Sequence, residues 1–187
     1  MPPKARITKE QIISAGLELV RNVGQDNLNV RSIAARLGCS TQPIMSHYAA
    51  VQELRADIYA AADAFHSEYL LRIPEGEDPL LSIGLNYIRF AAEERHLFRF
   101  LFQSDKFESS VRDLLSDDAL SPIIEPLSQE AGLNEQQARE VFETLFFCAH
   151  GIAALLANNS IDYDEEYCVK LLTTAFMGAV GYMKGGE

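Results

Sequence analysis

Two pairs of side chains have the residue types and the spacing of metal ligands. Asp63 and His66 lie three residues apart, and so do Glu93 and His96. Residues three apart share one face of a helix, so each pair has the geometry to hold one metal ion. A di-iron helical bundle needs two Glu-x-x-His pairs and a glutamate from each of two further helices. One acid here is an aspartate and the sequence identifies no further glutamates, so a di-metal oxidase is kept only as a minor alternative.

No other pattern in the sequence predicts catalysis. The chain contains no Gly-rich phosphate loop, no Cys-x-x-Cys pair and no Gly-x-Ser-x-Gly elbow. We therefore expect no enzyme activity, no catalytic residue, no metal site and no cofactor. The three cysteines are scattered, which is typical of a reducing compartment. Because no apolar run follows Met1 and the apolar stretch of residues 145–157 is too short to span a bilayer, we expect a cytoplasmic protein with no membrane partner.

A group of polar side chains after residue 40 has the chemistry of base recognition. Residues 38–40 form a predicted turn between two short helices, which is the plan of a helix-turn-helix. Two apolar side chains of the second helix, four residues apart, would face inward: Ile44 and Tyr48. The remaining side chains would face outward, with His47 at the margin: Thr41, Gln42, Met45 and Ser46. Glutamine can form two hydrogen bonds to adenine, and threonine, serine or methionine can contact a thymine methyl group.

Charge is unevenly distributed along the chain, whose formal net charge is −11. Residues 1–56 contain seven Lys or Arg and four acids, giving +3, whereas the remaining 131 residues contain nine and 23, giving −14. A basic end on an acidic chain indicates a segment that binds a polyanion. Phosphate contacts would come from Lys4, Arg6 and Arg31.

The elements that would position these residues are all helices. Thr8 and Gln11 fit a capping box at the start of a first helix, and Gly24 fits its end. Later helices have predicted caps at Asn29, Ser40 and Asn134. Apolar residues at helical spacing predict long helices over residues 51–71, 134–158 and 164–183. No run of alternating apolar and polar residues predicts a strand, so the expected fold class is all-α.

Three stretches near the N-terminus form a pattern that is more specific than the bare motif. They are QIISAGLEL at residues 11–19, NVRSIAARLGCS at 29–40 and IMSHY at 44–48, accompanied by Gly24 and Glu53-Leu54. Together they resemble the DNA-binding domain of the TetR (tetracycline-repressor-like) transcriptional regulators. The resemblance covers about a quarter of the chain. It implies a helix-turn-helix DNA-binding domain at residues 1–50 and a helical ligand-binding and dimerisation domain at 51–187.

The DNA-binding residues that the motif and the resemblance imply include two departures from the family pattern. Met45 replaces a tyrosine and Val51 replaces a lysine, both of which contact phosphate in the family. Gln42 and Pro43 also differ from the usual residues, and Asn29 takes a threonine position. The predicted DNA-binding set is Lys4, Arg6, Asn29, Arg31, Ser40, Thr41, Gln42, Pro43, Met45, Ser46, His47 and Tyr48.

The second domain carries an aromatic cluster and small residues at helical spacing. Ligand sites are mostly apolar with a few placed polar groups. Although a single aromatic residue is more often core than ligand site, the predicted ligand-binding set is Phe65, Tyr69, Tyr87, Phe90, Phe98, Phe102, Phe147 and His150. Gly and Ala residues in the last two helices favour close helix packing, which by analogy and by the resemblance predicts a homodimer seam.

The predicted function is that of a ligand-responsive, sequence-specific DNA-binding regulator. The resemblance implies a repressor that leaves an inverted-repeat operator in double-stranded DNA when a small apolar or aromatic ligand binds. Ligand would move the helix at residues 51–71 and so change the spacing of the two recognition helices. The alternative within the family is a protein with weakened DNA binding that acts through a protein partner, because of Met45 and Val51.

Overall fold

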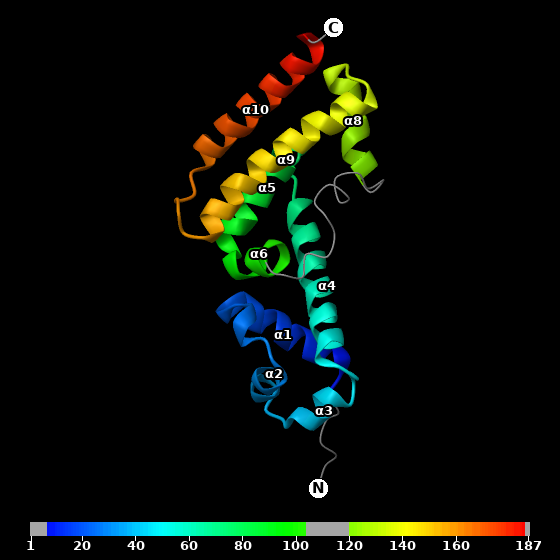
Figure 1. Cartoon of the computed structure of the whole chain (residues 1–187), viewed down its shortest axis with the longest axis vertical. Coiled ribbons are helices and arrows are strands. Elements are labelled where there is room, and N and C mark those ends of the chain that lie inside the picture. The colour runs from blue at the N-terminus through cyan, green and yellow to red at the C-terminus, as the bar shows by residue number, and fades with distance from the viewer. Residues whose placement is uncertain (1–6, 104–119, 186–187) are drawn as a thin grey trace. The chain divides into compact units, whose positions relative to one another are not determined.

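The computed structural model describes residues 7–103 and 120–185, and these residues form helices and connecting turns without any strand (Figure 1). The predicted all-α fold class is confirmed. The first elements are α1 (Lys9–Val23), a short 3-10 turn η1 (Gln25–Asn27), α2 (Val30–Arg36), α3 (Thr41–Met45) and α4 (Val51–Leu70). They are followed by α5 (Pro79–Glu93), α6 (Arg95–Phe102), α8 (Ser121–Ala131), α9 (Glu135–Ala157) and α10 (Glu165–Gly185). Lys4 and Arg6 lie outside the described residues.

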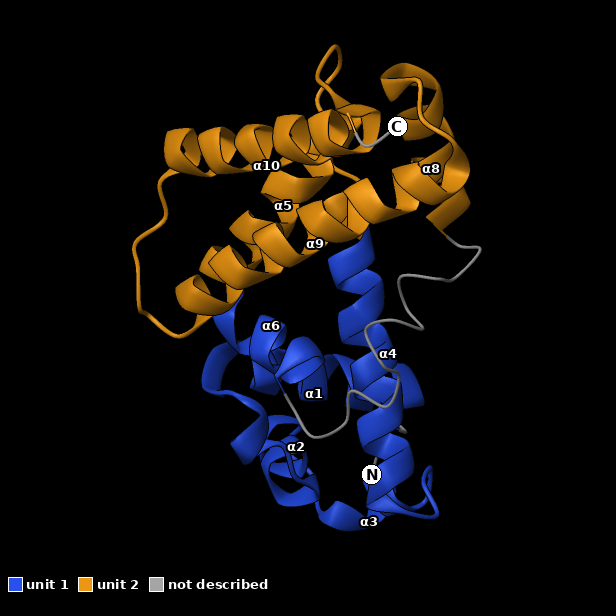
Figure 2. Ribbon diagram, turned by 45° about the horizontal axis from the view of Figure 1, so that its top comes forward, with its two compact units in different colours: residues 1–67, 94–104 blue, residues 68–93, 105–187 orange. Residues whose placement is uncertain are grey.

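The chain packs into two compact units (Figure 2). The first unit consists of residues 1–67 and 94–104, and the second of residues 68–93 and 105–187. The units are therefore interleaved along the sequence, and α4 contributes residues to both. The chain passes from the second unit to the first at the bend between Glu93 and Glu94.

In the first unit, local hydrogen bonds determine where the helices begin, and tertiary packing determines which face of each helix is buried. Thr8 and Gln11 form the predicted capping box of α1, and Gly24 ends that helix with φ +85°, a conformation that L side chains rarely adopt. The buried core combines residues of all four N-terminal helices: Ile12, Val20, Ile33, Ile44, Leu54 and Ile58. The α1 backbone approaches α4 closely at Gly16. A Cβ on Gly16 would lie 2.3 Å from Ile58 Cδ1, so the absence of a side chain allows this approach.

In the second unit, α9 is the central helix and packs against α5, α8 and α10. Asn134 caps it as predicted, accepting a hydrogen bond from the Gln137 N–H at 2.9 Å, and the Gln137 side chain completes a capping box. Among the described residues, only α9 is long and apolar enough to cross a bilayer by length and composition. Its inward residues, such as Val141 and Leu145, belong to the hydrophobic core of the unit. These contacts identify it as a core helix.

Candidate nucleic-acid interface and ligand site

The residues of α3 and its flanks divide into a buried face and an exposed face. Ile44 is fully buried and Tyr48 is 3% exposed. Pro43 and His47 are half-buried, and the following side chains are exposed: Ser40, Thr41, Gln42, Met45 and Ser46. The division follows the predicted spacing, and it leaves an exposed surface of four residues, the polar Thr41, Gln42 and Ser46 and the apolar Met45, which we call the α3 surface.

Several polar groups around the α3 surface are already engaged within the protein. The Asn29 carboxamide accepts a hydrogen bond from the Ser32 N–H at 3.0 Å and so caps α2 as predicted. Ser46 Oγ donates to the Pro43 carbonyl at 2.7 Å. Ser40 occupies the predicted cap position of α3, but its side chain makes no capping hydrogen bond. Gln42 and Thr41 therefore offer the most accessible polar groups for base contacts.

Three cations of the first unit form ion pairs with acids of the same unit. Lys9 Nζ lies 2.7 Å from an Asp57 carboxylate oxygen and lowers the pKa of that carboxyl group. Arg36 pairs with Glu18, and Arg21 Nε donates to Glu94 Oε2 at 2.7 Å. Arg31 is exposed and makes no ion pair among the described residues. Of the predicted phosphate contacts, Arg31 is thus the described residue whose charge is not neutralised internally.

The two departures from the family pattern lie at the surface. Met45 is 40% exposed and Val51, the first residue of α4, is 37% exposed. Apolar side chains thus occupy the two positions at which the family has phosphate-contacting groups, so phosphate binding would depend on the remaining cations.

Two of the predicted ligand-binding residues of the first unit, Phe98 and Phe102 of α6, form an aromatic cluster with His66 of α4. Phe98 is fully buried, and its ring centroid lies 5.0 Å from that of Phe102. The ring of His66 meets Phe102 edge-on at 5.1 Å, and the Arg21 guanidinium lies over the Phe65 ring at 5.3 Å.

Burial of His66 makes the stability of the protein depend on pH. The side chain is 6% exposed, and burial lowers its pKa from 6.5 to about 4. The unfolded chain therefore binds this proton more readily, and stability is lost as the pH falls from 6.5 to 4. We expect His66 to contribute about 3 kcal/mol to this loss. In urea titrations across that range, His66→Gln is expected to show the smaller pH dependence, and equal pH dependence in both proteins would contradict the assignment.

The predicted ligand-binding residues of the second unit form two contacts. The Tyr87 hydroxyl lies 2.8 Å from His150 Nδ1, and Phe146 stacks on the His150 ring at 5.7 Å. Burial lowers the pKa of His150, which favours the neutral ring, whose Nδ1 can accept a hydrogen bond from the Tyr87 hydroxyl. Tyr69 meets the fully buried Phe90 edge-on at 5.3 Å. The sequence predicted Tyr87 and His150 separately, whereas their pairing required the fold.

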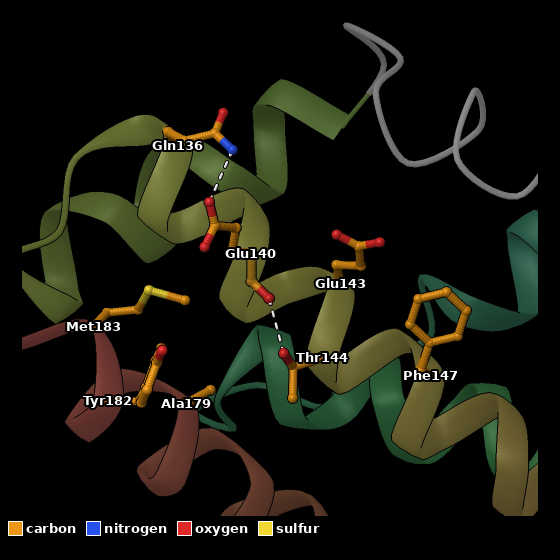
Figure 3. A pocket seen from close by; sticks show the side chains of 8 residues that line it. All are labelled: Gln136, Glu140, Glu143, Thr144, Phe147, Ala179, Tyr182 and Met183. Carbon is orange, nitrogen blue, oxygen red and sulfur yellow. Dashed lines mark hydrogen bonds between the residues drawn. The ribbon is translucent and has the colours of Figure 1, made fainter. Parts of the chain in front are cut away.

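Phe147 meets the Phe146 ring edge-on at 5.7 Å and lies at the surface of α9. It is 51% exposed and lines an open pocket of about 700 Å³ between α9 and α10 (Figure 3). The other lining residues are Gln136, Glu140, Glu143, Thr144, Ala179, Tyr182 and Met183. Glu140 accepts a hydrogen bond from Gln136 at 3.0 Å.

These two helices carry large exposed apolar side chains. Phe147 and Leu155 of α9 are about half exposed, and Tyr167, Met177 and Tyr182 of α10 are 53%, 68% and 77% exposed. Of the 21 residues of α10, only Cys168 and Leu172 are buried. We call this surface, defined by Phe147, Leu155, Tyr167, Met177 and Tyr182, the α9–α10 face.

The acid and histidine pairs that suggested a metal site are not brought together with further ligands. Glu93 accepts a hydrogen bond from the Tyr69 hydroxyl at 2.6 Å, and His66 is packed against Phe102. Within residues 7–103 and 120–185, no group of three or more His, Cys, Asp or Glu side chains is placed to hold a metal ion.

The fold and the exposed α3 surface define a class of protein: all-helical, with an N-terminal helix-turn-helix followed by a larger helical unit. Residues 80–176 match the family model of the tetracyclin repressor-like C-terminal domain. The chain therefore belongs to the TetR family of DNA-binding transcriptional regulators. This confirms the family that the N-terminal residues indicated, from a different part of the sequence.

Two solved structures from Rhodococcus sp. RHA1 share the fold. One is a transcriptional regulator at 18% identity and a TM-score of 0.67, with 96% of this chain and 97% of that chain aligned. The other is a TetR-like transcriptional regulator at 17% identity and a TM-score of 0.64, with both chains aligned in full. A search of curated protein sequences finds no match.

Proposed function

We propose that the protein is a homodimeric, cytoplasmic repressor that binds an inverted-repeat operator and leaves it when a small apolar or aromatic molecule binds. The observation that carries the proposal is the α3 surface. Thr41 and Gln42 are exposed on a short helix whose opposite side, Ile44, is fully buried. A helix held in this way can enter the major groove and present its polar side chains to base edges.

Dimerisation is supported by the α9–α10 face. Large apolar side chains on two adjacent helices are rarely left in water as a contiguous patch. A second copy would cover the face with twofold symmetry, so that the same residues meet from both sides. Two α3 surfaces related by that symmetry would read two half-sites, which accounts for an inverted repeat.

Ligand response is supported by the second unit and by α4. Tyr87 and His150 form a polar pair beside the aromatic ring of Phe146, and a few polar groups among apolar side chains are the composition of a small-molecule site. A ligand that binds one conformation of this unit more tightly than another shifts the conformational equilibrium of the dimer toward the conformation that it prefers. Because α4 contributes to both units, it is the covalent route by which the shift reaches the α3 surface.

The test of the proposed function is a selection from random duplex DNA with the purified full-length protein at moderate salt. Enrichment of an inverted repeat is the expected result, and it supplies an operator for the experiments below. No enrichment, even at low salt where phosphate attraction is strongest, would contradict the proposal. The exposure of Met45 and Val51 would then favour the alternative, a TetR-like protein that acts through a protein partner.

Two substitutions are expected to separate base contacts from phosphate contacts. Gln42→Ala should lower discrimination between the selected operator and single-base variants by about 1–3 kcal/mol at the contacted position. Arg31→Ala should weaken binding to all sequences and reduce the salt slope by about 1 per subunit. Titrations of labelled operator at several salt concentrations measure both quantities. If the two variants behaved alike, the assignment of Gln42 to bases and Arg31 to phosphate would be wrong.

A further inference from the structure

The chain passes between the two units at two places within residues 7–103. The first lies inside α4, between Ser67 and Glu68, and the second is the peptide bond between Glu93 and Glu94. Consecutive Cα atoms are 3.8 Å apart across a trans peptide bond, so a displacement of Glu93 is passed directly to Glu94. This second crossing is a covalent route that does not depend on α4.

On the second-unit side of this bond, Glu93 is fixed at the end of α5. It is the last residue of that helix, and its carboxylate accepts a hydrogen bond from the Tyr69 hydroxyl at 2.6 Å. The Tyr69 ring packs edge-on against Phe90 of the same helix at 5.3 Å. Tyr87, which pairs with His150, lies six residues before Glu93, a distance of about 9 Å along a helix. One continuous helix therefore connects Glu93 with the candidate ligand site.

On the first-unit side of the bond, Glu94 is buried and held by Arg21 of α1. Its side chain is 9% exposed. It accepts two hydrogen bonds from the guanidinium group, from Nε to Oε2 at 2.7 Å and from Nη2 to Oε1. A bidentate pair of this kind fixes orientation as well as distance. The guanidinium group also lies over the Phe65 ring of α4, so α4 and Glu94 both restrain its position.

The end of α1 that carries Arg21 contacts α6 and belongs to the helix-turn-helix. Arg21 lies in the last turn of α1, and a Cβ on Gly24, which ends this helix, would lie 3.2 Å from His96 Nδ1 of α6. Further along the unit, α1 packs against α2, and α2 packs against α3. These three helices bury the following side chains: Ile12, Val20, Ile33 and Ile44. Because protein interiors are close-packed, a displacement of α1 is transmitted to α3.

We propose that Glu93 and Glu94 form a relay that passes a conformational change of α5 to α1, and through α1 to the α3 surface. Tyr69 and Arg21 are its positioning residues, because Tyr69 holds Glu93 within the second unit and Arg21 holds Glu94 within the first. The relay acts beside α4. It rests on the proposed function, which supplies the ligand that moves α5 and the operator that α3 reads. Tyr69 thereby acts in coupling, in place of the ligand contact that the sequence predicted.

A double-mutant cycle in the free, full-length protein tests the relay without ligand or DNA. Tyr69→Phe keeps the ring and removes only the hydroxyl group that binds Glu93. It is expected to raise amide exchange at residues 20–24, the last turn of α1 and its cap, by about 3-fold. Glu94→Gln breaks the charged pair with Arg21. In the Glu94→Gln background, Tyr69→Phe is expected to cause no further rise, because the relay is already interrupted.

Glu18→Gln is the matched control for Glu94→Gln. It also removes an α1 ion pair between a glutamate and an arginine, but the partner is Arg36 of α2 and α6 is not involved. In this background, Tyr69→Phe is expected to raise exchange at residues 20–24 as it does in the wild type. Equal effects of Tyr69→Phe in the wild type and in Glu94→Gln would overturn the relay. Arg21→Lys keeps the charge without the bidentate pair and provides the same test if Glu94→Gln does not fold.

Titration of the selected operator shows whether the relay reaches α3. Tyr69→Phe and Glu94→Gln are each expected to lower operator affinity by about 3-fold, because α1 is held less firmly and the helix-turn-helix is less preorganised. The double variant is expected to lose about 3-fold as well, whereas independent effects would multiply to about 9-fold. A loss of about 9-fold would contradict an effect of the relay on DNA binding.

The outcomes distinguish the relay from the proposed function. Wild-type protein that enriches no DNA would contradict the proposed function, and the exchange cycle in the free protein would still decide whether Glu93 and Glu94 couple α5 to α1. Wild-type protein that binds the operator, with additive effects of the two substitutions on exchange, would overturn the relay alone. Thermal unfolding of each variant shows whether a lost contact or a lost fold causes the change.

Discussion

Replacing Met177 by glutamate is expected to convert the proposed dimer into a monomer and to lower affinity for the selected operator by at least about 100-fold, or roughly 2.7 kcal/mol. Met177 is 68% exposed at the α9–α10 face. If a second copy covers this face, the substitution buries a carboxylate without a partner, and twofold symmetry introduces it twice. Glutamate and methionine have similar helix propensities, so α10 itself should still form.

Sedimentation measures the oligomeric state of the Met177→Glu protein, and titration with the selected operator measures its affinity. Gln129→Glu is the matched control, because it adds the same charge at an exposed position of α8 outside the face. The control is expected to remain dimeric and to bind as the wild type does. A Met177→Glu protein that stayed dimeric with unchanged affinity would show that the α9–α10 face is not the interface.

Features that depend on neighbouring residues could be predicted from the sequence. The capping boxes of α1 and α9 link residues three apart, Thr8 with Gln11 and Asn134 with Gln137. The helix-turn-helix likewise needs only the spacing of Ile33, Ile44 and Tyr48 to show which face is buried. In each case the side chains that decide the structure lie close together along the chain.

Features that join distant segments could not be predicted in this way. The Arg21–Glu94 ion pair joins residues 73 apart, and the Tyr87–His150 contact joins residues 63 apart. Helical spacing shows that both members face inward or outward on their own helices, but the partner depends on which helices pack together. The buried carboxylate of Glu94 illustrates the point, because its sequence context, Glu93 and Arg95, resembles that of an exposed helix end.

The aromatic residues show this limit of prediction from the sequence most clearly, because residues with the same sequence pattern lie in three different environments. Phe90 and Phe98 are fully buried, Phe102 and Phe65 are partly exposed, and Phe147 is 51% exposed on an open face. All of them lie at helical spacing among apolar neighbours. The direction in which each ring points is set by tertiary packing, so a ligand-binding set chosen from the sequence contains core residues as well.

Phe98→Ala is expected to lower the free energy of unfolding by about 3–5 kcal/mol, the usual effect of removing a buried phenyl ring. The Phe98 ring is fully buried in α6 and packs against Phe102. Urea unfolding followed by circular dichroism measures the change. Val23→Ala is the control, because Val23 is 49% exposed on α1 of the same unit and should change stability by less than about 0.5 kcal/mol.

The size of the loss in Phe98→Ala decides between two roles for this ring. A core ring leaves a cavity that the surrounding side chains fill only in part, so stability falls by the full amount. A ring that lines a ligand space already has open volume on one side and fewer contacts to lose. A loss of stability below about 1 kcal/mol would therefore support Phe98 as a ligand-binding residue. A loss of several kcal/mol would identify Phe98 as a core residue, and the candidate ligand site would then consist of Tyr87, His150 and their neighbours in the second unit.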